Sequence, residues 1–506
     1  MTTETGTRTV RVGDTPQWDR LRGAGIAGLL GLSSLVAAAA LAKFGPVIVD
    51  LGSASVARLR VPLRLPTLIL AIAAVALFAV AIARLASLRR VPTRPVVLVA
   101  AVILVGLGVA VLLAVLHLQS EVPLHTRNGW LFFRGAEFSD LADTRQWRKF
   151  SDPYAPKIGI FYAPAGLGLL DLLSRIPFPA EYLVFAVLVL GATAGAALAA
   201  SAGCRRWVRG GLVIAFLLSY ATQFGLERGN LEAIGLVLLV PAALAAEAGF
   251  SGVGGAIAGV FASLKLVGLP LLLGAGPRRA RWLLSGLAMV LVLHVSASMA
   301  QGFGPVDSAR AVVENAQSAS SDLYDFDIYA HPNTSVQFSS SVDSMFVAGA
   351  AFVRGPSGVK RARPIVESSA YLAIKLLLVG LACLWAFFFD DKQWRRVAIV
   401  YSCYILVPPV SYDYKLVLLL VPLMLLLRSG AKTRVELAIA VSLALALIPK
   451  AYWYLGDSPT STTTVLGPLT ILLVLLLCLG SGIADRIRND GIEATPGSEE
   501  RVASIR

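Results

Sequence analysis

The chain has 506 residues, of which 56% are hydrophobic and only 15% charged, and its formal net charge is +14. Soluble globular domains carry about 25% charged residues, so the composition excludes a soluble fold and predicts an integral membrane protein. The excess of Lys and Arg does not indicate a nucleic-acid partner, because these residues are distributed over short loops between apolar segments, where positive charge sets the orientation of the spans.

Apolar segments follow one another along almost the whole chain. A spanning helix needs roughly 20 apolar residues, and about thirteen segments are candidates. They lie near 24–42, 66–84, 95–118, 181–201, 210–223, 230–248, 253–274, 281–300, 367–389, 395–409, 413–428, 435–455 and 464–483. The predicted fold class is therefore all-α, a polytopic membrane helix bundle of about 12–14 spans with long external loops. No clear cleavage site follows the first segment, so we interpret it as a retained span.

Short basic loops predict which side of the bundle faces the cytoplasm. They contain Arg84–Arg94, Arg205–Arg209, Arg278–Arg281, Lys392–Arg396, Arg428–Arg434 and Arg486–Arg488. The expected order is a cytoplasmic tail (1–20), N-terminal spans (21–118), an external loop with an interfacial helix (119–180), central spans with a broken helix (181–300), an external loop (301–366), C-terminal spans (367–484) and a cytoplasmic tail (485–506). We expect disordered tails and a short surface helix around Ser341–Val353.

The stretch between residues 204 and 281 conflicts with a simple count of crossings. Two basic loops that should share a side are separated there by three apolar segments. One segment is therefore expected to be a broken or partial helix, which is possible only where protein or water shields the free backbone groups. The predicted break coincides with Gly225–Asn230 and Ser263–Pro270. If Phe161–Ile176 crossed the bilayer instead, Arg205 and Arg206 would lie outside, so we interpret that segment as interfacial or re-entrant.

The four cysteines lie in or beside predicted spans, without paired or metal-like spacing: Cys204, Cys383, Cys403 and Cys478. Neither a disulfide framework nor a zinc site is indicated. No metal and no cofactor are expected.

Acidic residues collect in the loop after the third predicted span. The loop contains Glu137-Phe-Ser-Asp140-Leu-Ala-Asp143-Thr-Arg145, then Asp152-Pro-Tyr154 and Phe161-Tyr162-Ala-Pro164. Deprotonating a sugar hydroxyl at neutral pH requires a carboxylate held near the reacting centre and partly sheltered from water. The plain alternative is a solvated loop carboxylate.

Further charges stand at the ends of apolar segments, where they are costly unless paired or functional. Glu227, Arg228 and Asn230 form one group and Lys265 a second; Tyr412, Asp413 and Lys415 follow two prolines in a third. Arg and Lys can bind a phosphate. The structural alternatives are a Glu–Arg pair, a Lys265 that snorkels to the interface and an Asp413 that caps a helix. His331 is an isolated loop histidine, either incidental or a phosphate-binding residue.

In their order, these motifs resemble the GT-C membrane glycosyltransferases, specifically glycosyltransferase family 87, which includes mannosyl- and arabinofuranosyltransferases of the actinobacterial envelope. Asp140 is similar to the family's first-loop acid. Asp152-Pro-Tyr154 and Phe161-Tyr-Ala-Pro164 resemble its Asp-Pro-Tyr and Phe-x-Tyr-Pro-Pro segments. Glu227-Arg-Gly-Asn230, Lys265-Leu-Val-Gly-Leu-Pro270 and Ser411-Tyr-Asp-Tyr-Lys415 resemble its later motifs. The resemblance covers about 300 residues, but two extra spans precede the catalytic loop.

The resemblance implies transfer of a sugar from a polyprenyl-phosphate donor to a glycolipid or polysaccharide acceptor, with inversion, at the outer face of a bacterial plasma membrane. It makes Asp140 the general base, with Glu137 and Asp143 as alternatives. Substrate binding would fall to Asp143, Arg145, Tyr154, Tyr162, Glu227, Arg228, Asn230, Lys265, His331, Tyr412, Asp413 and Lys415. Of these, Arg228, Lys265, Lys415 and His331 would stabilise the leaving lipid phosphate.

A transporter or flippase of lipid-linked sugars would share the broken helices and the interior charges. The two classes make different predictions about where the charges lie. In an enzyme the motifs should converge on one outward-facing site, whereas in a transporter the charges should line a path toward both faces.

Overall fold

The computed structural model describes residues 24, 27–28, 31–34, 65–85, 91–119, 154, 162–176, 180–274, 278–323, 339–408, 411–449 and 463–493. Every regular element in these ranges is a helix, and extended backbone pairs there only at an isolated antiparallel bridge between Ser339 and Tyr412. The predicted all-α class is therefore confirmed.

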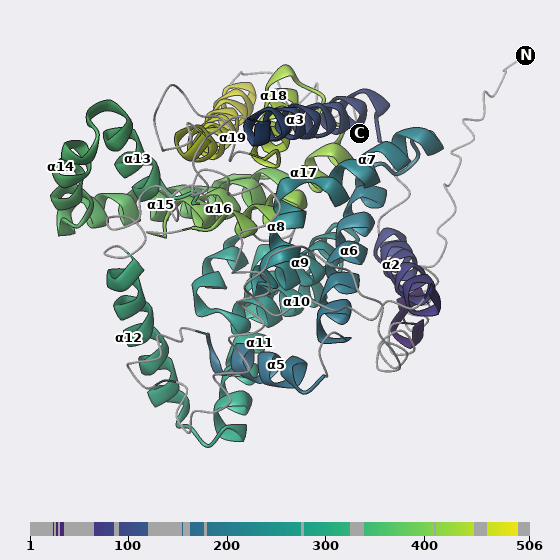
Figure 1. Cartoon of the computed structure of the whole chain (residues 1–506), viewed down its shortest axis with the longest axis horizontal. Helices are drawn as coiled ribbons and strands as arrows, with labels where there is room; N and C mark the ends of the chain where they lie inside the picture. The colour runs from purple at the N-terminus through teal and green to yellow at the C-terminus, as the bar shows by residue number, and fades with distance from the viewer. Residues whose placement is uncertain are drawn as a thin grey trace, which may run out of the picture.

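The helices are arranged as Figure 1 shows. In chain order they are α2 (Leu65–Leu85), α3 (Thr93–Gln119), α5 (Pro164–Ser174), α6 (Ala180–Ala200), α7 (Arg206–Leu218), α8 (Tyr220–Arg228), α9 (Leu231–Glu247), α10 (Ser251–Leu264), the 3-10 helix η2 (Leu266–Leu273), α11 (Arg279–Ala300), α12 (Pro305–Leu323), α13 (Val342–Arg354), α14 (Pro356–Val366), α15 (Ser369–Phe389), α16 (Gln393–Leu406), the 3-10 helix η5 (Asp413–Leu419), α17 (Leu420–Ser429), α18 (Arg434–Ala446) and α19 (Thr463–Glu493).

Within the described ranges, five helices are long and apolar enough to cross a membrane, namely α3, α6, α11, α15 and α19. The bent pair α7–α8 makes a sixth if it is one span. The total of about thirteen crossings stays a prediction.

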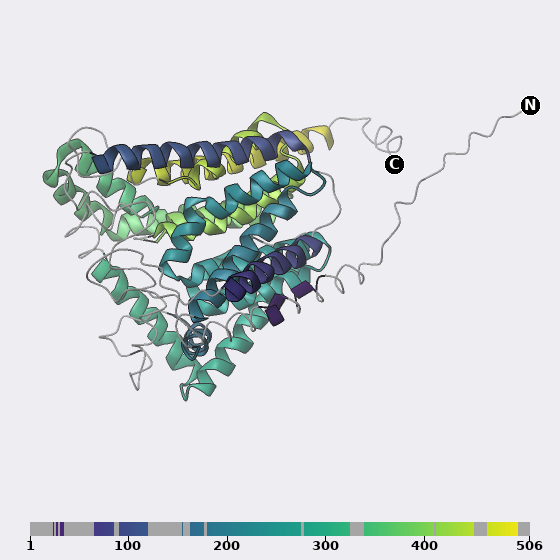
Figure 2. The ribbon, with the colours of Figure 1, turned by 45° about the vertical axis from the view of Figure 1, so that its right-hand side comes forward.

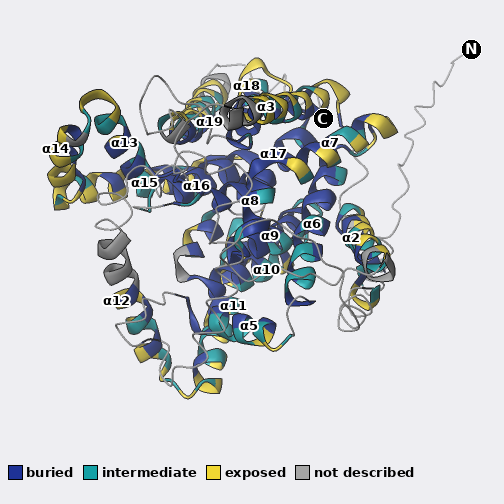
Figure 3. Cartoon of the chain, in the orientation of Figure 1, coloured by how far each residue is buried: buried dark blue, intermediate teal, exposed yellow. Residues whose placement is uncertain are grey.

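The core of the bundle is formed by η5, α17, α16 and α9. The run Leu416–Leu427 is apolar on all sides and buried throughout, which is typical of a helix surrounded by other helices. Figure 3 shows this centre as buried, whereas the outer faces of α3 and α14 are exposed. The long apolar helices α11 and α15 are mostly exposed along their hydrophobic stretches, so these faces are suited to contact lipid.

One end of the bundle collects the loops that the sequence marks as basic. Arg279 donates hydrogen bonds to the carbonyl oxygens of Phe388 and Asp390, both at 2.6 Å. Arg428 reaches the carbonyl oxygen of Ala199 at 3.1 Å, and close by the amide of Val91 donates to Ala202. We name this region the basic end. The basic loops therefore share one end of the bundle, as the sequence predicts.

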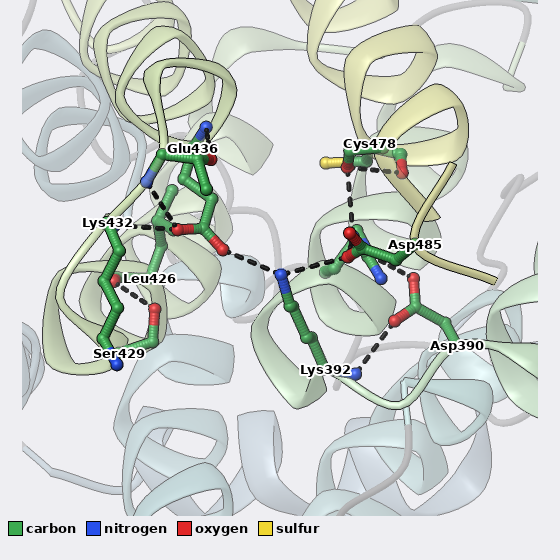
Figure 4. Close-up of polar contacts among 11 residues, drawn as sticks. Asp390, Lys392, Leu426, Ser429, Lys432, Glu436, Cys478 and Asp485 are labelled. Carbon is green, nitrogen blue, oxygen red and sulfur yellow. Dashed lines mark hydrogen bonds and ion pairs between the residues drawn. The ribbon is translucent and has the colours of Figure 1, made fainter. Parts of the chain in front are cut away.

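A network of ion pairs connects the helices at the basic end (Figure 4). Lys392, in the loop between α15 and α16, lies 3.0 Å from Glu436 on α18 and 3.1 Å from Asp485 on α19. Burial alone lowers the pKa of Lys392, but the hydrogen bonds to these two carboxylates outweigh it and raise the pKa above its ordinary value. Asp485 also accepts from Arg395 at 2.9 Å. The network thereby joins α16, α18 and α19.

Two helix breaks lie between residues 204 and 281, where the sequence gives conflicting counts of crossings. Helices α7 and α8 meet at a bend of 44°, and α9 then runs back to Glu247, which pairs with Arg428 at the basic end. Next, α10 lies parallel to α11 and stops at Lys265, and η2 folds back against it to Gly274, next to Val397. The pair α10–η2 thus begins and ends at the basic end. The predicted interruptions at Gly225–Asn230 and Ser263–Pro270 are confirmed.

Other predictions for single segments have mixed outcomes. The helix expected around Ser341–Val353 is confirmed as α13, and α5 forms within 161–176. The interfacial or re-entrant position of α5 stays a prediction. The disordered tail expected from residue 485 is wrong for its first part, because α19 continues to Glu493. Ion pairs of Asp485 stabilise this extension.

Candidate functional site

The predicted site residues fall into two sets. Glu137, Asp140, Asp143, Arg145 and His331, together with Asp152, lie outside the described residues. Their roles stay predictions. The structure describes the remaining predicted residues: Tyr154, Tyr162, Glu227, Arg228, Asn230, Lys265, Tyr412, Asp413 and Lys415.

Lys265 lies at the tip of the α10–η2 turn, with its backbone extended between the two helices. Its side chain is buried, and its Nζ is 2.8 Å from Oε1 of Glu232, which is fully buried. The same ammonium lies 4.7 Å from the centre of the Tyr162 ring, within the range of a cation–π interaction. Snorkelling to the interface is therefore not the explanation for Lys265.

Local backbone features bring Glu232 and Lys265 together. Gly229 ends α8 in the left-handed conformation, with φ of 64°, and Asn230 then caps α9, its Oδ1 accepting from the amide of Glu232 at 2.9 Å. An Asn at this position satisfies an amide that would otherwise have no partner. Glu232 is thereby fixed in the first turn of α9, where a carboxylate is also favoured by the helix dipole.

Tyr162 is held against the same turn by the backbone. The amide of Ala163 donates to the carbonyl oxygen of Leu264 at 3.2 Å. A Cβ added to Gly166 would lie 2.2 Å from that oxygen, so only glycine allows α5 to approach so closely. Tyr154 extends the contact, because its hydroxyl donates to the carbonyl oxygen of Tyr162 at 3.2 Å. The two tyrosines of the first-loop motifs therefore lie at the Lys265 site.

Lys415, in η5, is the second buried lysine of the site. Its ammonium lies 5.2 Å from the centre of the Tyr404 ring and interacts electrostatically with both Glu232 and Lys265. Among the described residues it makes no ion pair within hydrogen-bond distance. The Tyr404 hydroxyl and Oε2 of Glu232 are also buried there and interact electrostatically, and neither atom has a partner at hydrogen-bond distance among the described residues. Such groups are costly in a protein interior, so the site is polar and incompletely satisfied.

Asp413, two positions before Lys415 in η5, is buried and accepts two hydrogen bonds. The hydroxyl of Tyr220 donates to Oδ2 at 3.1 Å, and Ser340 donates to Oδ1 at 2.5 Å. The carboxylate therefore connects α8 and the 339–341 segment to η5 rather than only capping a helix. The amide of Ser340 also donates to the carbonyl oxygen of Ser411 at 2.7 Å. The second long polar loop is thereby attached to the late motif.

The remaining predicted residues in the described ranges are Tyr412, Glu227 and Arg228. Tyr412 is half-buried, and its ring centre is 5.8 Å from that of Tyr414. Glu227 is buried in the last turn of α8 and interacts electrostatically with Tyr182, on α6, while Arg228 is half-buried. Glu227 and Arg228 are therefore not assigned to the Lys265 site.

Sequence reasoning missed four residues that shape the site: Tyr220, Glu232, Ser340 and Tyr404. Glu232 carried a usable signal, because an acidic residue inside the apolar segment 230–248 is costly unless it is paired. The tyrosines and the serine carried none, since these residue types are common in membrane helices and loops.

Two ammonium groups and one carboxylate meet in this buried site, so it is suited to bind an anion. A phosphate would offset the unpaired charge of Lys415 and accept hydrogen bonds from neighbouring hydroxyls. Among the described residues, no group of three or more His, Cys, Asp or Glu lies together as metal ligands would. In comparisons with protein-family models, with curated proteins and with solved structures, the chain matches none.

Proposed function

We propose that this chain is a membrane glycosyltransferase that transfers a sugar, mannose or arabinofuranose, from a polyprenyl-phosphate donor to an envelope glycolipid or polysaccharide. The observation that carries the proposal is the buried Lys415, which has no ion-pair partner among the described residues, next to the Lys265–Glu232 pair. The donor's phosphate is an anion that would occupy such a site. The sugar, the acceptor class and the GT-C family are taken from the motif resemblance.

The proposed reaction assigns each group a separate task. Asp140 takes the proton from an acceptor hydroxyl, and the acceptor oxygen attacks the anomeric carbon from the face opposite the phosphate. The bond between that carbon and the phosphate oxygen breaks, and its electron pair stays on the phosphate. Negative charge therefore grows on the leaving group, where Lys265 and Lys415 stabilise it more strongly than in the ground state.

The distribution of charge supports an enzyme over a transporter. Glu232 and Glu247 stand at opposite ends of α9, about 22 Å apart at 1.5 Å per residue. Between Lys415 and Arg428 the described chain is an unbroken, buried apolar run. A transporter needs polar groups along its path, and this part of the chain provides none.

A transfer assay tests the proposal. Purified protein in nanodiscs receives radiolabelled polyprenyl-phosphate mannose or arabinofuranose and mixed envelope acceptors, as the native chain and as Asp140→Asn and Lys415→Met. Lys432→Met, which changes an exposed lysine at the basic end, is the control. We expect Asp140→Asn to abolish transfer, Lys415→Met to lower it by about 10²–10³-fold, and the control to retain it. The transporter would be established instead if the native chain transferred no sugar from either donor but moved lipid-linked sugar across the membrane of proteoliposomes.

A further inference from the structure

Helices α13 and α14 form a hairpin at the edge of the molecule (Figures 1 and 2). They are joined by Gly355, whose φ of 59° and ψ of −149° favour glycine. The helices touch closely, since a Cβ added to Gly358 would lie 2.0 Å from the carbonyl oxygen of Ala350. A small apolar core of Val347, Ala348, Ala362 and Val366 holds them together.

The hairpin is fixed next to a membrane-spanning candidate. Only Glu367 and Ser368 separate α14 from α15, a helix long and apolar enough to cross a bilayer. Lys375, in the second turn of α15, donates to both carboxylate oxygens of Asp343 on α13, at 2.9 and 2.7 Å. Because this pair is buried, the hairpin cannot move away from the start of the span. If α15 crosses the bilayer, the hairpin lies next to its point of entry.

An apolar groove of about 210 Å³ runs between the two helices. Its walls come mainly from Phe346, Ala350, Val353 and Ile365. Val353 is 76% exposed, Ile365 50% and Phe346 41%. Large apolar side chains exposed together on both walls of a groove indicate a surface that is covered by another molecule.

Two arginines line the same groove near the hairpin tip. Arg354 is the last residue of α13, and Arg361 lies on α14. Helical side chains lean toward the helix N-terminus, which for α14 is the hairpin tip. Both are exposed, and neither forms an ion pair with any described residue. The N-terminus of α14 lies at this tip without a side-chain cap and adds partial positive charge. Arg363, in contrast, is already paired with Glu367 at 3.0 Å.

We propose that the groove between α13 and α14 binds a bilayer lipid with an anionic phosphate headgroup. The phosphate contacts Arg354 and Arg361, whose forked donors match phosphate oxygens, and an acyl chain lies along Phe346, Val353 and Ile365. Three features favour a lipid over a protein partner: the groove is beside a span, it is apolar along its walls, and its charge is concentrated at one end. Basic residues at a membrane surface attract anionic lipids in the same way.

Native mass spectrometry of the purified full chain in detergent tests this proposal. The probes are phosphatidylglycerol and phosphatidylcholine with the same acyl chains, titrated against the native chain and the double variant Arg354→Gln, Arg361→Gln. The control, Arg310→Gln with Arg434→Gln, removes the same charge from two other exposed positions. We expect the groove variant to weaken phosphatidylglycerol binding by on the order of tenfold, since charged hydrogen bonds are lost, with the control unchanged.

Further variants separate the remaining outcomes. Val353→Ser should weaken binding of both lipids, because the apolar wall is shortened, and millimolar inorganic phosphate should not displace phosphatidylglycerol. Equal affinity of the native chain and the groove variant for phosphatidylglycerol would overturn the proposal. Displacement of phosphatidylglycerol by free phosphate would also overturn it, because it would indicate a site for a soluble anion. A dimer that Phe346→Ser dissociates would overturn it as well, because a second copy of the chain would then cover the groove. The variants change exposed side chains, and unchanged thermal midpoints would confirm folding.

Discussion

The ammonium of Lys265 lies 2.8 Å from the carboxylate of Glu232 at the point where α10 ends and η2 turns back. Neither side chain is accessible enough to be solvated. Each charge therefore depends on the other, and the pair joins the α10–η2 turn to the first turn of α9. This dependence makes the pair both a structural contact and a fixed electrostatic feature of the candidate site.

Replacing Lys265 with Met should destabilise the protein strongly. The change leaves the Glu232 carboxylate buried without its cation, which costs about 3–5 kcal/mol. The thermal midpoint in detergent should fall well below that of the native chain, whereas Lys265→Met combined with Glu232→Gln should recover part of the loss because no charge is left unpaired. A double variant as unstable as Lys265→Met would show that the pairing is not the cause.

Replacing Lys415 with Met should impair sugar transfer without lowering stability. No described residue pairs with this ammonium, so an apolar side chain of similar length should leave the thermal midpoint unchanged or raise it. Sugar transfer should nevertheless fall by about 10²–10³-fold, as expected when a group that stabilises transition-state charge is removed. A large drop in stability with proportionate loss of transfer would assign Lys415 a structural role.

The sequence predicts those features of the fold that are marked by neighbouring residues, but not the contacts between residues far apart in the chain. The breaks at Gly229 and Lys265 were predictable, because glycine with charged neighbours and an isolated lysine stand inside otherwise apolar segments. The partner of Lys265 was not, since the lysine lies 33 positions along the chain from Glu232 and the pairing depends on how α9 packs against α10. Ser340 and Asp413, which also form a hydrogen bond, are separated by 73 positions along the chain. Such a contact follows only from the packed fold.

The Asp343–Lys375 pair should fix the hairpin to α15 in a measurable way. Tyr371→Phe removes only the hydroxyl that donates to Asp343 at 2.7 Å and should cost about 1 kcal/mol. Lys375→Met leaves the fully buried Asp343 carboxylate without its cation and should cost several times more. Hydrogen exchange of the α13 amides should increase in the same order. Equal exchange in the native chain and Lys375→Met would mean that apolar contacts alone hold α13.

Glu436 should make stability depend on pH at the basic end. Burial by itself raises the pKa of Glu436, but hydrogen bonds from Lys392 and from the backbone amides of Thr433 and Lys432 outweigh it, so the pKa lies below its ordinary value of 4.5. A carboxylate with a lowered pKa in the folded state stabilises the protein above its unfolded pKa, and this contribution is lost as the pH falls through the folded pKa. Acid should therefore loosen the contact between α18 and the loop at Lys392.

The measurement compares thermal midpoints of the native chain and Glu436→Gln at several pH values. At pH 7 the variant should be less stable by about 1–2 kcal/mol, because it lacks the charge-assisted hydrogen bonds. The difference should narrow below about pH 4 as Glu436 is protonated. Glu314→Gln, which changes an exposed carboxylate on α12, should show no such convergence. A gap between native and Glu436→Gln that stays constant from pH 7 to pH 3 would mean that the ionised Glu436 does not stabilise the ion-pair network.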